Sequence, residues 1–176
     1  TVTGVQTCAL PICPDWHIVL IGKPRSGMNM RALLEPENIH YLGLKPFEEL
    51  PGYTQHFSLG LIPFRRNELT ASCNPLKLLE YLSGGLPVVS TDIPEVHRFD
   101  GLVNIAGSAD EFISLCERAL DGDNRRERRH RSDLAEQHSW RHRVDELSDI
   151  LARAAGETSR ASKGNTGPKK RKEASE

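Results

Sequence analysis

The sequence has 176 residues, of which 38% are hydrophobic and 27% are charged, and its formal net charge is −1. These values exclude a wholly disordered chain and a strongly cationic nucleic-acid coat, and the length suits one domain with its own core. No apolar run approaches the roughly 20 residues that a membrane-spanning helix needs. The four cysteines show neither zinc-ligand spacing nor the density of a disulfide scaffold, which indicates reduced thiols in a cytoplasmic protein.

The first twelve residues, TVTGVQTCALPI, match no pattern in the rest of the chain. Residues 2–12 resemble the translation of a widely used sequencing-library adaptor. We therefore expect residues 1–12 to be an adaptor artefact and the native sequence to begin at about Cys13, and we leave the segment out of the fold prediction as one would a tag. On this interpretation the domain that follows is truncated at its N-terminus.

Five short β-rich runs alternate with helical patterns along the remaining chain. The runs are residues 17–22, 39–43, 59–64, 87–91 and 102–106. Such alternation is typical of βαβ units, so we predict an α/β fold in which helices flank a parallel sheet.

Helix signals occupy the spaces between and after these runs. A helix is predicted over residues 75–83, with Asn74 as its N-cap, and another begins at a capping box of Ser108 and Glu111. From residue 124 to about 154 the pattern predicts two helices broken near Ser139. We expect residues 13–154 to form one domain and residues 155–176, which lack apolar periodicity, to form a disordered basic tail.

The segment from Leu59 to Asp92 contains the pattern most indicative of chemistry. Ligands of open α/β sheets bind beyond the carboxyl ends of the strands, where the loop after residue 64 would lie. The helix start at Asn74 offers unpaired N–H groups to a phosphate, and Lys77 adds a positive charge. Glu80 lies one turn further on and can accept hydrogen bonds from ribose hydroxyls. This pattern indicates a nucleoside diphosphate, although an ordinary surface pair of Lys77 and Glu80 is the alternative.

Residues 14 to about 153 resemble the C-terminal, donor-binding domain of retaining GT-B glycosyltransferases. The resemblance is to bacterial enzymes that make envelope polysaccharides of the teichuronic-acid and exopolysaccharide type, and it implies the Rossmann-like C-terminal half of a GT-B fold. Its motifs, in order, are PDWHIVLIG (14–22), NIHYLGLKPFEELPGY (38–53), GLIPF (60–64), NPLKLLEYLSGGLPVVST (74–91) and HSWRHRVDEL (138–147).

The resemblance implies transfer of a sugar from a UDP- or GDP-sugar donor to a carbohydrate or lipid-linked acceptor. No further cofactor is implied, and we expect no metal, with protein groups neutralising the charge of the diphosphate. The acceptor site would belong to an N-terminal domain, so this chain is not expected to turn over alone. We expect a cytoplasmic protein with peripheral contact at the inner face of the plasma membrane, and no nucleic-acid partner.

Individual site residues are also implied by the resemblance. Glu80 matches the glutamate that holds the ribose, and Ser72 stands where the wider family often has a second glutamate, with Glu68 and Thr70 as nearby candidates. Lys77 and Arg65 are the candidates for stabilising the leaving diphosphate, with Arg66 beside them. Residues matching the nucleobase loop are Gly43, Leu44 and Lys45, and those facing the diphosphate and sugar are Ser72, Cys73, Asn74, Pro75, Leu76 and Lys77.

Two other functions remain open at this stage. Ser72 in place of an acidic residue favours a non-catalytic nucleotide-sugar-binding module, and a nucleotide-sugar epimerase on the same fold is a further alternative. The basic clusters at residues 125–131 and 169–172 fit a solvated helix face with a tail, or attraction to anionic lipid headgroups. None of the seven histidines shows a metal-ligand spacing, so we assign them structural roles.

Overall fold

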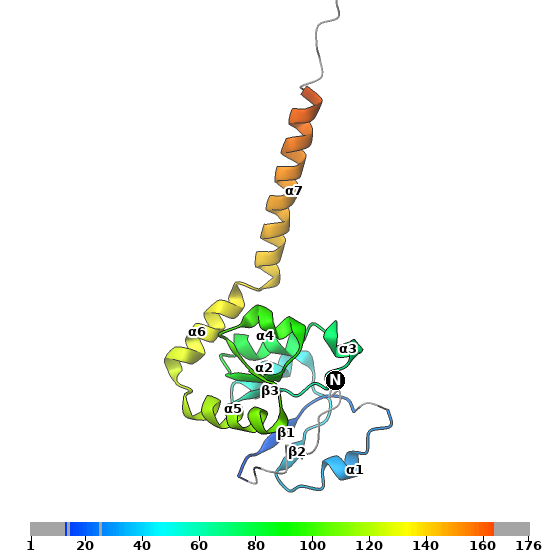
Figure 1. The fold of residues 1–176 in the computed structure, drawn as a ribbon, viewed down its shortest axis with the longest axis vertical. Helices are drawn as coiled ribbons and strands as arrows, with labels where there is room; N and C mark the ends of the chain where they lie inside the picture. The colour runs from blue at the N-terminus through cyan, green and yellow to red at the C-terminus, as the bar shows by residue number, and fades with distance from the viewer. Residues whose placement is uncertain (1–12, 14, 25, 164–176) are drawn as a thin grey trace, which may run out of the picture. The chain divides into compact units, whose positions relative to one another are not determined.

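A computed structural model describes residues 13, 15–24 and 26–163 of the chain. Residues 1–12, which we interpret as adaptor, lie outside the described residues. The chain divides into two compact units, residues 1–136 and residues 137–176. All strands of the described part belong to the first unit, which Figure 1 shows with its helices.

The five predicted strands are present, each shorter than its sequence run. β1 (Ile18–Leu20) pairs in parallel with β2 (Ile39–Tyr41). β3 (Gly60–Ile62), β4 (Val88–Thr91) and β5 (Val103–Ala106) form a second parallel sheet in the order β3-β4-β5. The predicted α/β fold with parallel strands and flanking helices is confirmed.

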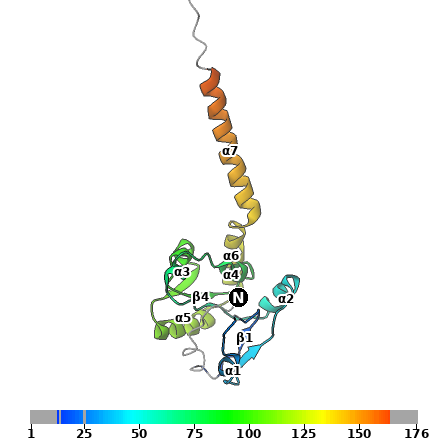
Figure 2. The ribbon, with the colours of Figure 1, turned by 90° about the vertical axis from the view of Figure 1, so that its right-hand side faces the viewer.

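Backbone hydrogen bonds divide the strands into two sheets, where the sequence predicted one. The connection between the sheets is made by side chains, because Leu61 of β3 packs against the apolar cluster of Ile18, Leu20 and Ile39. Figure 2 shows β1 together with α1 (Met30–Leu33) and α2 (Leu50–Thr54), apart from β4 and α5. Strand order is a long-range property that hydrophobic runs do not specify.

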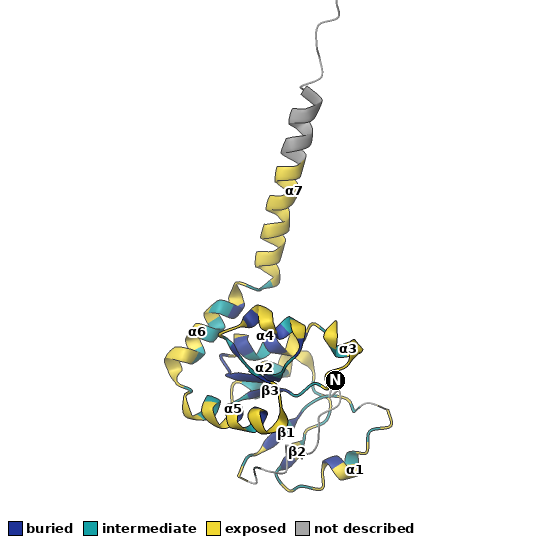
Figure 3. Cartoon of the chain, viewed as in Figure 1, coloured by how far each residue is buried: buried dark blue, intermediate teal, exposed yellow. Residues whose placement is uncertain are grey.

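Helices cover both faces of the three-stranded sheet. Val88 belongs to a buried cluster with Leu78 and Leu82 of α4 (Leu76–Ser83), whereas Val89 packs with Phe112 of α5 (Ala109–Asp121). Neighbouring residues of a strand point to opposite faces, so β4 is buried on both sides. Figure 3 colours buried residues dark blue, and they gather in the sheet and on α4.

The caps of the two main helices differ in detail from the prediction. At α4, Pro75 occupies the N-cap position and makes no side-chain cap, so the predicted Asn74 cap is wrong. The helix begins one residue later than expected, which leaves the Asn74 amide too early in the chain to reach the first turn. At α5, Ser108 accepts from the Glu111 N–H as predicted, but the Glu111 carboxylate accepts from Gly107 N–H instead of the N-cap residue.

Close backbone approach explains two glycines beside α4. A Cβ on Gly60 would lie 2.6 Å from the Tyr81 ring. Gly85, at φ +74°, follows the end of α4, and a Cβ there would lie 2.7 Å from the carbonyl oxygen of Arg128 in α6 (Arg125–Glu136). These approaches allow β3 and α6 to pack tightly around α4.

Several short elements have no counterpart in the predicted pattern. Asn29 caps α1 through its side chain, and Asn67 forms a capping box with Thr70 in α3. These elements are too short to show a helical period, and only α1 and α3 among them have a side-chain cap. They are α1, η2 (Phe47–Glu49), α2, α3 (Glu68–Ala71) and η3 (Pro94–Phe99).

The second unit consists of α7 (Trp140–Lys163). The predicted break near Ser139 is confirmed, since α6 ends at Glu136. The helix runs beyond residue 155, where we predicted the tail to begin. No proline occurs between Trp140 and Pro168, and Ala154 and Ala155 favour helix. Residues 164–176 lie outside the described residues. No helix in the described part of the chain is long and apolar enough to cross a bilayer.

Candidate functional site

The candidate site lies at the carboxyl edge of the three-stranded sheet. The segment of residues 63–67 follows β3, Asp92 follows β4, and Gly107 follows β5. Because the three strands are parallel, these segments emerge on the same edge. Thr91 Oγ1 donates to the Phe64 carbonyl at 2.8 Å, which ties the ends of β3 and β4 together. Ligand sites of open α/β sheets lie at this edge.

The first turn of α4 presents an anion-binding end next to this edge. Among the described residues, no side chain caps the helix, and the buried ring of Pro75 fixes its entry. Lys77 Nζ lies 2.6 Å from Glu80 Oε2, and the two side chains are 48% and 36% exposed. The predicted neighbourhood of Lys77 and Glu80 on one side of the helix is therefore present. An uncapped helix start beside a lysine can hold a phosphate.

The predicted residues just before α4 lie at the surface. Ser72 is the exposed C-cap residue of α3, Cys73 is a half-buried free thiol, and Asn74 is exposed. Leu76, the first residue of α4, is 63% exposed. These side chains leave the start of α4 open to a ligand. At position 72 the site has the neutral hydroxyl of Ser72, where a glutamate would add a negative charge.

The two arginines after β3 have different surroundings. Arg66 Nη2 donates to the Gly107 carbonyl at 3.1 Å, and its Nη1 lies 3.6 Å from Asp92 Oδ2. The exposed side chain of Arg65 has no such partner among the described residues. Thr70 Oγ1 donates to the Arg65 carbonyl at 2.5 Å, which fixes the backbone of this loop. Arg65 is thus the arginine whose guanidinium is available to an anion.

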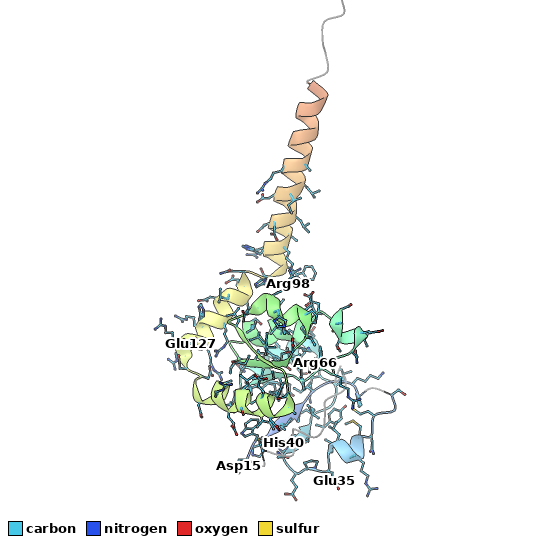
Figure 4. All side chains as sticks on the ribbon, viewed as in Figure 1. Asp15, Glu35, His40, Arg66, Arg98 and Glu127 are labelled. Atoms are coloured by element: carbon cyan, nitrogen blue, oxygen red, sulfur yellow. The ribbon has the colours of Figure 1, made fainter. Side chains whose placement is uncertain are left out.

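A charged cluster that the sequence did not predict as a site occupies the same edge. Asp92 lies between Arg66 and His97 of η3, whose Nε2 donates to Asp92 Oδ1 at 2.7 Å. The sequence contains one hint of this cluster: a charged residue follows each of two predicted strands, Arg66 after the third and Asp92 after the fourth. Since the partners come from different loops, their pairing could not be derived from spacing. Figure 4 labels Arg66 in this region.

The predicted nucleobase loop follows β2. Gly43 has a φ of +73°, its carbonyl accepts from Gly22 N–H at 2.9 Å, and a Cβ on it would meet nothing within 4 Å. Leu44 is 73% exposed, and Lys45 Nζ lies 5.7 Å from the centre of the Tyr53 ring. The loop therefore has an open backbone face at Gly43. In the described part of the chain, no hydrogen bond or ion pair joins it to α4.

Burial shifts the pKa of two side chains packed behind the site. Burial, and secondarily the charge of Glu80, raises the pKa of Tyr81 above its ordinary value. Burial, with smaller contributions from Cys13 and Glu117, raises the pKa of Cys116 to about 12. Both groups are therefore neutral at physiological pH and belong to the packing around the sheet rather than to the reactive edge.

Other predicted basic or histidine groups have structural roles. Asp123 pairs with Arg128 at 2.6 Å and also with Arg131, and Arg131 donates to the Gly85 carbonyl at 2.9 Å. These two arginines therefore anchor α6 and are not part of a solvated basic face. His17, just before β1, and His40 of β2 have ring nitrogens 2.9 Å apart, in line with the structural role that we predicted for them.

A cavity of about 420 Å³ lies away from the predicted site. It is lined by residues that precede β4 and β5, among them Pro87 and Asp100, by residues 103–105 of β5, by Leu115 of α5, and by residues of α6 that include His130 and Arg131. The residues that precede β4 and β5 are at the amino ends of these strands, the edge opposite Lys77 and Asp92. None of the predicted site residues lines this cavity.

Comparison with known proteins identifies what this chain is similar to. The family model described as "Glycosyl transferases group 1" matches residues 5–122, a range that begins in the first twelve residues and ends just after α5. The chain is also 27% identical, over 113 residues, to the putative teichuronic acid biosynthesis glycosyltransferase TuaH of Bacillus subtilis (strain 168). That alignment covers 61% of this chain and 28% of the relative. The chain therefore spans well under half the length of the relative.

Proposed function

The chain belongs to the group 1 glycosyltransferase family, and from this premise we propose that it is the donor-binding half of a retaining GT-B glycosyltransferase. The enzyme would transfer a sugar from a nucleoside diphosphate sugar to a carbohydrate or lipid-linked acceptor. The similarity to the putative teichuronic acid biosynthesis glycosyltransferase of Bacillus subtilis supports a role in making a cell-envelope polysaccharide. The acceptor site is proposed to lie in another domain, so this chain alone would bind donor without transferring sugar.

The observation on which the proposal mainly rests is the start of α4. Its uncapped first turn faces solvent next to the Lys77–Glu80 pair, at the edge of the sheet where ligands bind. Without ligand, the lysine and glutamate neutralise each other. With donor bound, the diphosphate would take the lysine and the helix N–H groups, while the ribose hydroxyls would donate to the glutamate. One ion pair would thus be exchanged for two polar contacts with the donor.

The same groups would stabilise the charge that develops during transfer. The bond between the anomeric carbon and the diphosphate breaks as the acceptor oxygen bonds to that carbon, and negative charge collects on the leaving diphosphate. We propose that this negative charge is stabilised by the positive end of α4, by Lys77 and by the unpaired guanidinium of Arg65. Donors aimed at developing charge contribute more to rate than contacts made equally well in the ground state.

The loop after β2 is proposed to hold the nucleobase. At Gly43 the backbone is open, so a flat ring can approach the peptide groups without meeting a side chain. Leu44 and Lys45 would border the ring, with Lys45 already resting on Tyr53. Contacts to backbone groups suit uracil and guanine alike, and we propose a UDP- or GDP-sugar as donor.

The nature of the acceptor determines whether the enzyme works at a membrane. If the acceptor is lipid-linked, transfer takes place at a membrane surface, so we propose a cytoplasmic enzyme in peripheral contact with the inner face of the plasma membrane. Neither a nucleic-acid partner nor a further cofactor is part of the proposal.

Nucleotide binding to the 176-residue chain tests the proposal. In calorimetric titrations we expect UDP or GDP to bind, and Glu80→Gln to weaken binding by about tenfold, the effect of losing a hydrogen bond to a charged group. Glu80→Gln should cost less than about 0.5 kcal/mol of folding stability, because the pair with Lys77 is exposed. Glu95→Gln, which breaks the other i,i+3 ion pair of the described residues, is the matched control. The proposal fails if neither nucleotide binds, or if both variants behave alike.

The non-catalytic binding module remains the second candidate, because Ser72 is an exposed hydroxyl where the proposed sugar site would gain from a carboxylate. The two candidates differ in transfer activity. A longer chain with an acceptor domain should transfer sugar from one common donor, and the Glu80→Gln variant of that chain should lose most of the activity. Donor binding without transfer in that longer chain would favour the binding module. Donor-dependent change of the sugar without an acceptor would favour an epimerase.

A further inference from the structure

Arg66, Asp92 and His97 form a polar cluster at the carboxyl edge that the proposed function has not used. Asp92 Oδ1 accepts from His97 Nε2 at 2.7 Å, and Asp92 Oδ2 lies 3.6 Å from Arg66 Nη1. Arg66 is held in turn by the Gly107 carbonyl. Through the Asp92 carboxylate and the Arg66 guanidinium, the cluster therefore connects the segments that follow all three strands of this sheet.

The cluster is open to solvent. The side chains of Arg66, Asp92 and His97 are 59%, 42% and 57% exposed. Ion pairs at this exposure contribute at most about 1 kcal/mol to stability, so fold stability alone is a weak reason for three loops to meet here. The backbone of Asp92 is fixed, since its N–H donates to the Ala106 carbonyl at 3.0 Å. An ordered, exposed group of polar side chains is suited to a ligand.

The cluster lies on the same side of the sheet as the start of α4. Val96, next to His97, and Leu78, next to Lys77, belong to one buried apolar cluster. Asp92 also directly follows Thr91, whose hydroxyl is bonded to the carbonyl of Phe64 at the end of β3. The cluster and the proposed diphosphate site therefore share one edge and one face of the sheet.

The chemistry of the three side chains matches a sugar. A carboxylate accepts hydrogen bonds from hydroxyl groups, a guanidinium donates to hydroxyl oxygens, and the second ring nitrogen of an imidazole that already donates through Nε2 can accept from a hydroxyl. With Nε2 of His97 donating to Asp92, its Nδ1 can accept from a hydroxyl. Of the five N–H groups of Arg66, one donates to the Gly107 carbonyl, and Nη1 lies 3.6 Å from Asp92 Oδ2. Adjacent donors and acceptors are what vicinal hydroxyls require, whereas an anion would be repelled by Asp92.

We propose that Asp92, positioned by Arg66 and His97, binds hydroxyl groups of the donor's sugar and thereby contributes to sugar specificity; the proposal rests on the proposed function. Asp92 would supply the carboxylate that position 72, a serine, does not. Sites built to bond a hydroxyl reject ligands that lack it or present it with the wrong geometry, because the polar groups are then left unpaired. The cluster would therefore distinguish between sugars on the same nucleotide.

Calorimetric titrations of the 176-residue chain can separate the sugar from the nucleotide. The probes are UDP and GDP, followed by UDP-glucose, UDP-galactose, UDP-N-acetylglucosamine, UDP-glucuronic acid and GDP-mannose. We expect at least one nucleotide sugar to bind about tenfold more tightly than its nucleoside diphosphate. Asp92→Asn should remove that gain and leave the affinity for the nucleoside diphosphate within about twofold of the wild-type value. His97→Gln should reduce the gain in the same selective way.

The matched control is Arg98→Gln. Arg98 lies next to His97 in η3 but pairs with Glu95 at 3.3 Å, and Figure 4 labels it at a distance from Arg66. Circular dichroism confirms the fold of each variant. The proposal is overturned if no sugar in the panel adds affinity, or if Asp92→Asn weakens nucleoside diphosphate and nucleotide sugar equally. Failure of the proposed function looks different, since then neither UDP nor GDP binds the wild-type chain.

Discussion

Cys116 shows how burial determines the chemistry of a single side chain in this fold. It is 1% exposed, packed with Val89 and Phe112 between α5 and the sheet, and its pKa is raised to about 12 from an ordinary value of 9.0. The unfolded chain releases this proton at lower pH than the folded chain does. The thiol therefore adds stability that is complete below pH 9.0 and is lost as the pH rises towards about 12.

This shift predicts a specific loss of stability in alkali. Between pH 9.0 and about 12, the thiol should remove about 1.4 kcal/mol of unfolding free energy per pH unit from the wild-type chain. Cys116→Val keeps most of the packing but cannot titrate, so its stability relative to wild type should rise over that range. Urea unfolding of both chains from about pH 8 to about pH 11 measures the difference. Parallel pH profiles would contradict the assignment.

Individual site residues differ in how far the sequence could predict them. Lys77 and Glu80 lie one helical turn apart, so their contact follows from the helix period alone. The pairing of Asp92 with Arg66 depends on which strands are neighbours, and no local pattern contains that information. The Asn74 cap was wrong because a shift of one residue in a helix start changes which side chain can reach the first turn.

At the scale of elements, α6 depends on one carboxylate, that of Asp123, whose side chain is mostly shielded from solvent. Asp123 pairs with Arg128 and Arg131, and those arginines also donate to the carbonyls of Phe57 and Gly85. The side chains of Asp123 and Arg131 are 11% exposed. Removing one partner leaves a buried charge unpaired, so these contacts should matter far more than an exposed ion pair does.

We therefore expect Asp123→Ala to lower the unfolding free energy by about 3 kcal/mol. Arg129→Gln, which removes an exposed charge from the same helix, should change it by less than about 0.5 kcal/mol. Urea unfolding monitored by circular dichroism gives both values. A small effect of Asp123→Ala would mean that α6 is held mainly by its packing on α4.

Elements with a strong local signal were predictable from the sequence, and short ones were not. The five strands and the helices α4, α5 and α6 follow from apolar runs, caps and glycine stops. Helices of four or five residues, such as α1 and α3, complete barely one turn and leave no period to detect. The end of α7 was placed too early because apolar periodicity fades there while helix propensity does not.

At the scale of the whole molecule, the candidate site combines loops from distant parts of the sequence. The order β3-β4-β5 brings residues 63–67, 92–97 and 107 to one edge. The Gly43 loop follows a strand of the other sheet, and among the described residues no hydrogen bond joins this loop to α4. Parallel strand order was predictable as a class, but which loops become neighbours was not, because that depends on pairing between strands far apart in the chain.

The distribution of charge over the molecule limits how strongly it can bind a membrane. Arg128 and Arg131 are held by Asp123, so the exposed arginines of α6 are Arg125, Arg126 and Arg129. Each basic residue near an anionic surface contributes about 1 kcal/mol, and this attraction is screened beyond about 8 Å at physiological salt. With a net charge of −1, the chain as a whole adds nothing to the attraction. Any contact should therefore be weak and local.

We expect the chain to sediment with phosphatidylglycerol vesicles at low salt, to be released at about 0.15 M salt, and to ignore phosphatidylcholine vesicles. Reversing Arg125, Arg126 and Arg129 to glutamate should abolish sedimentation at low salt. Reversing three exposed but scattered residues, Lys23, Arg31 and Arg118, changes the net charge equally and should have little effect. Equal losses in both triple variants would mean that net charge, and not the α6 face, determines binding. Absence of sedimentation by the wild-type chain would remove the basis for proposing membrane contact through α6.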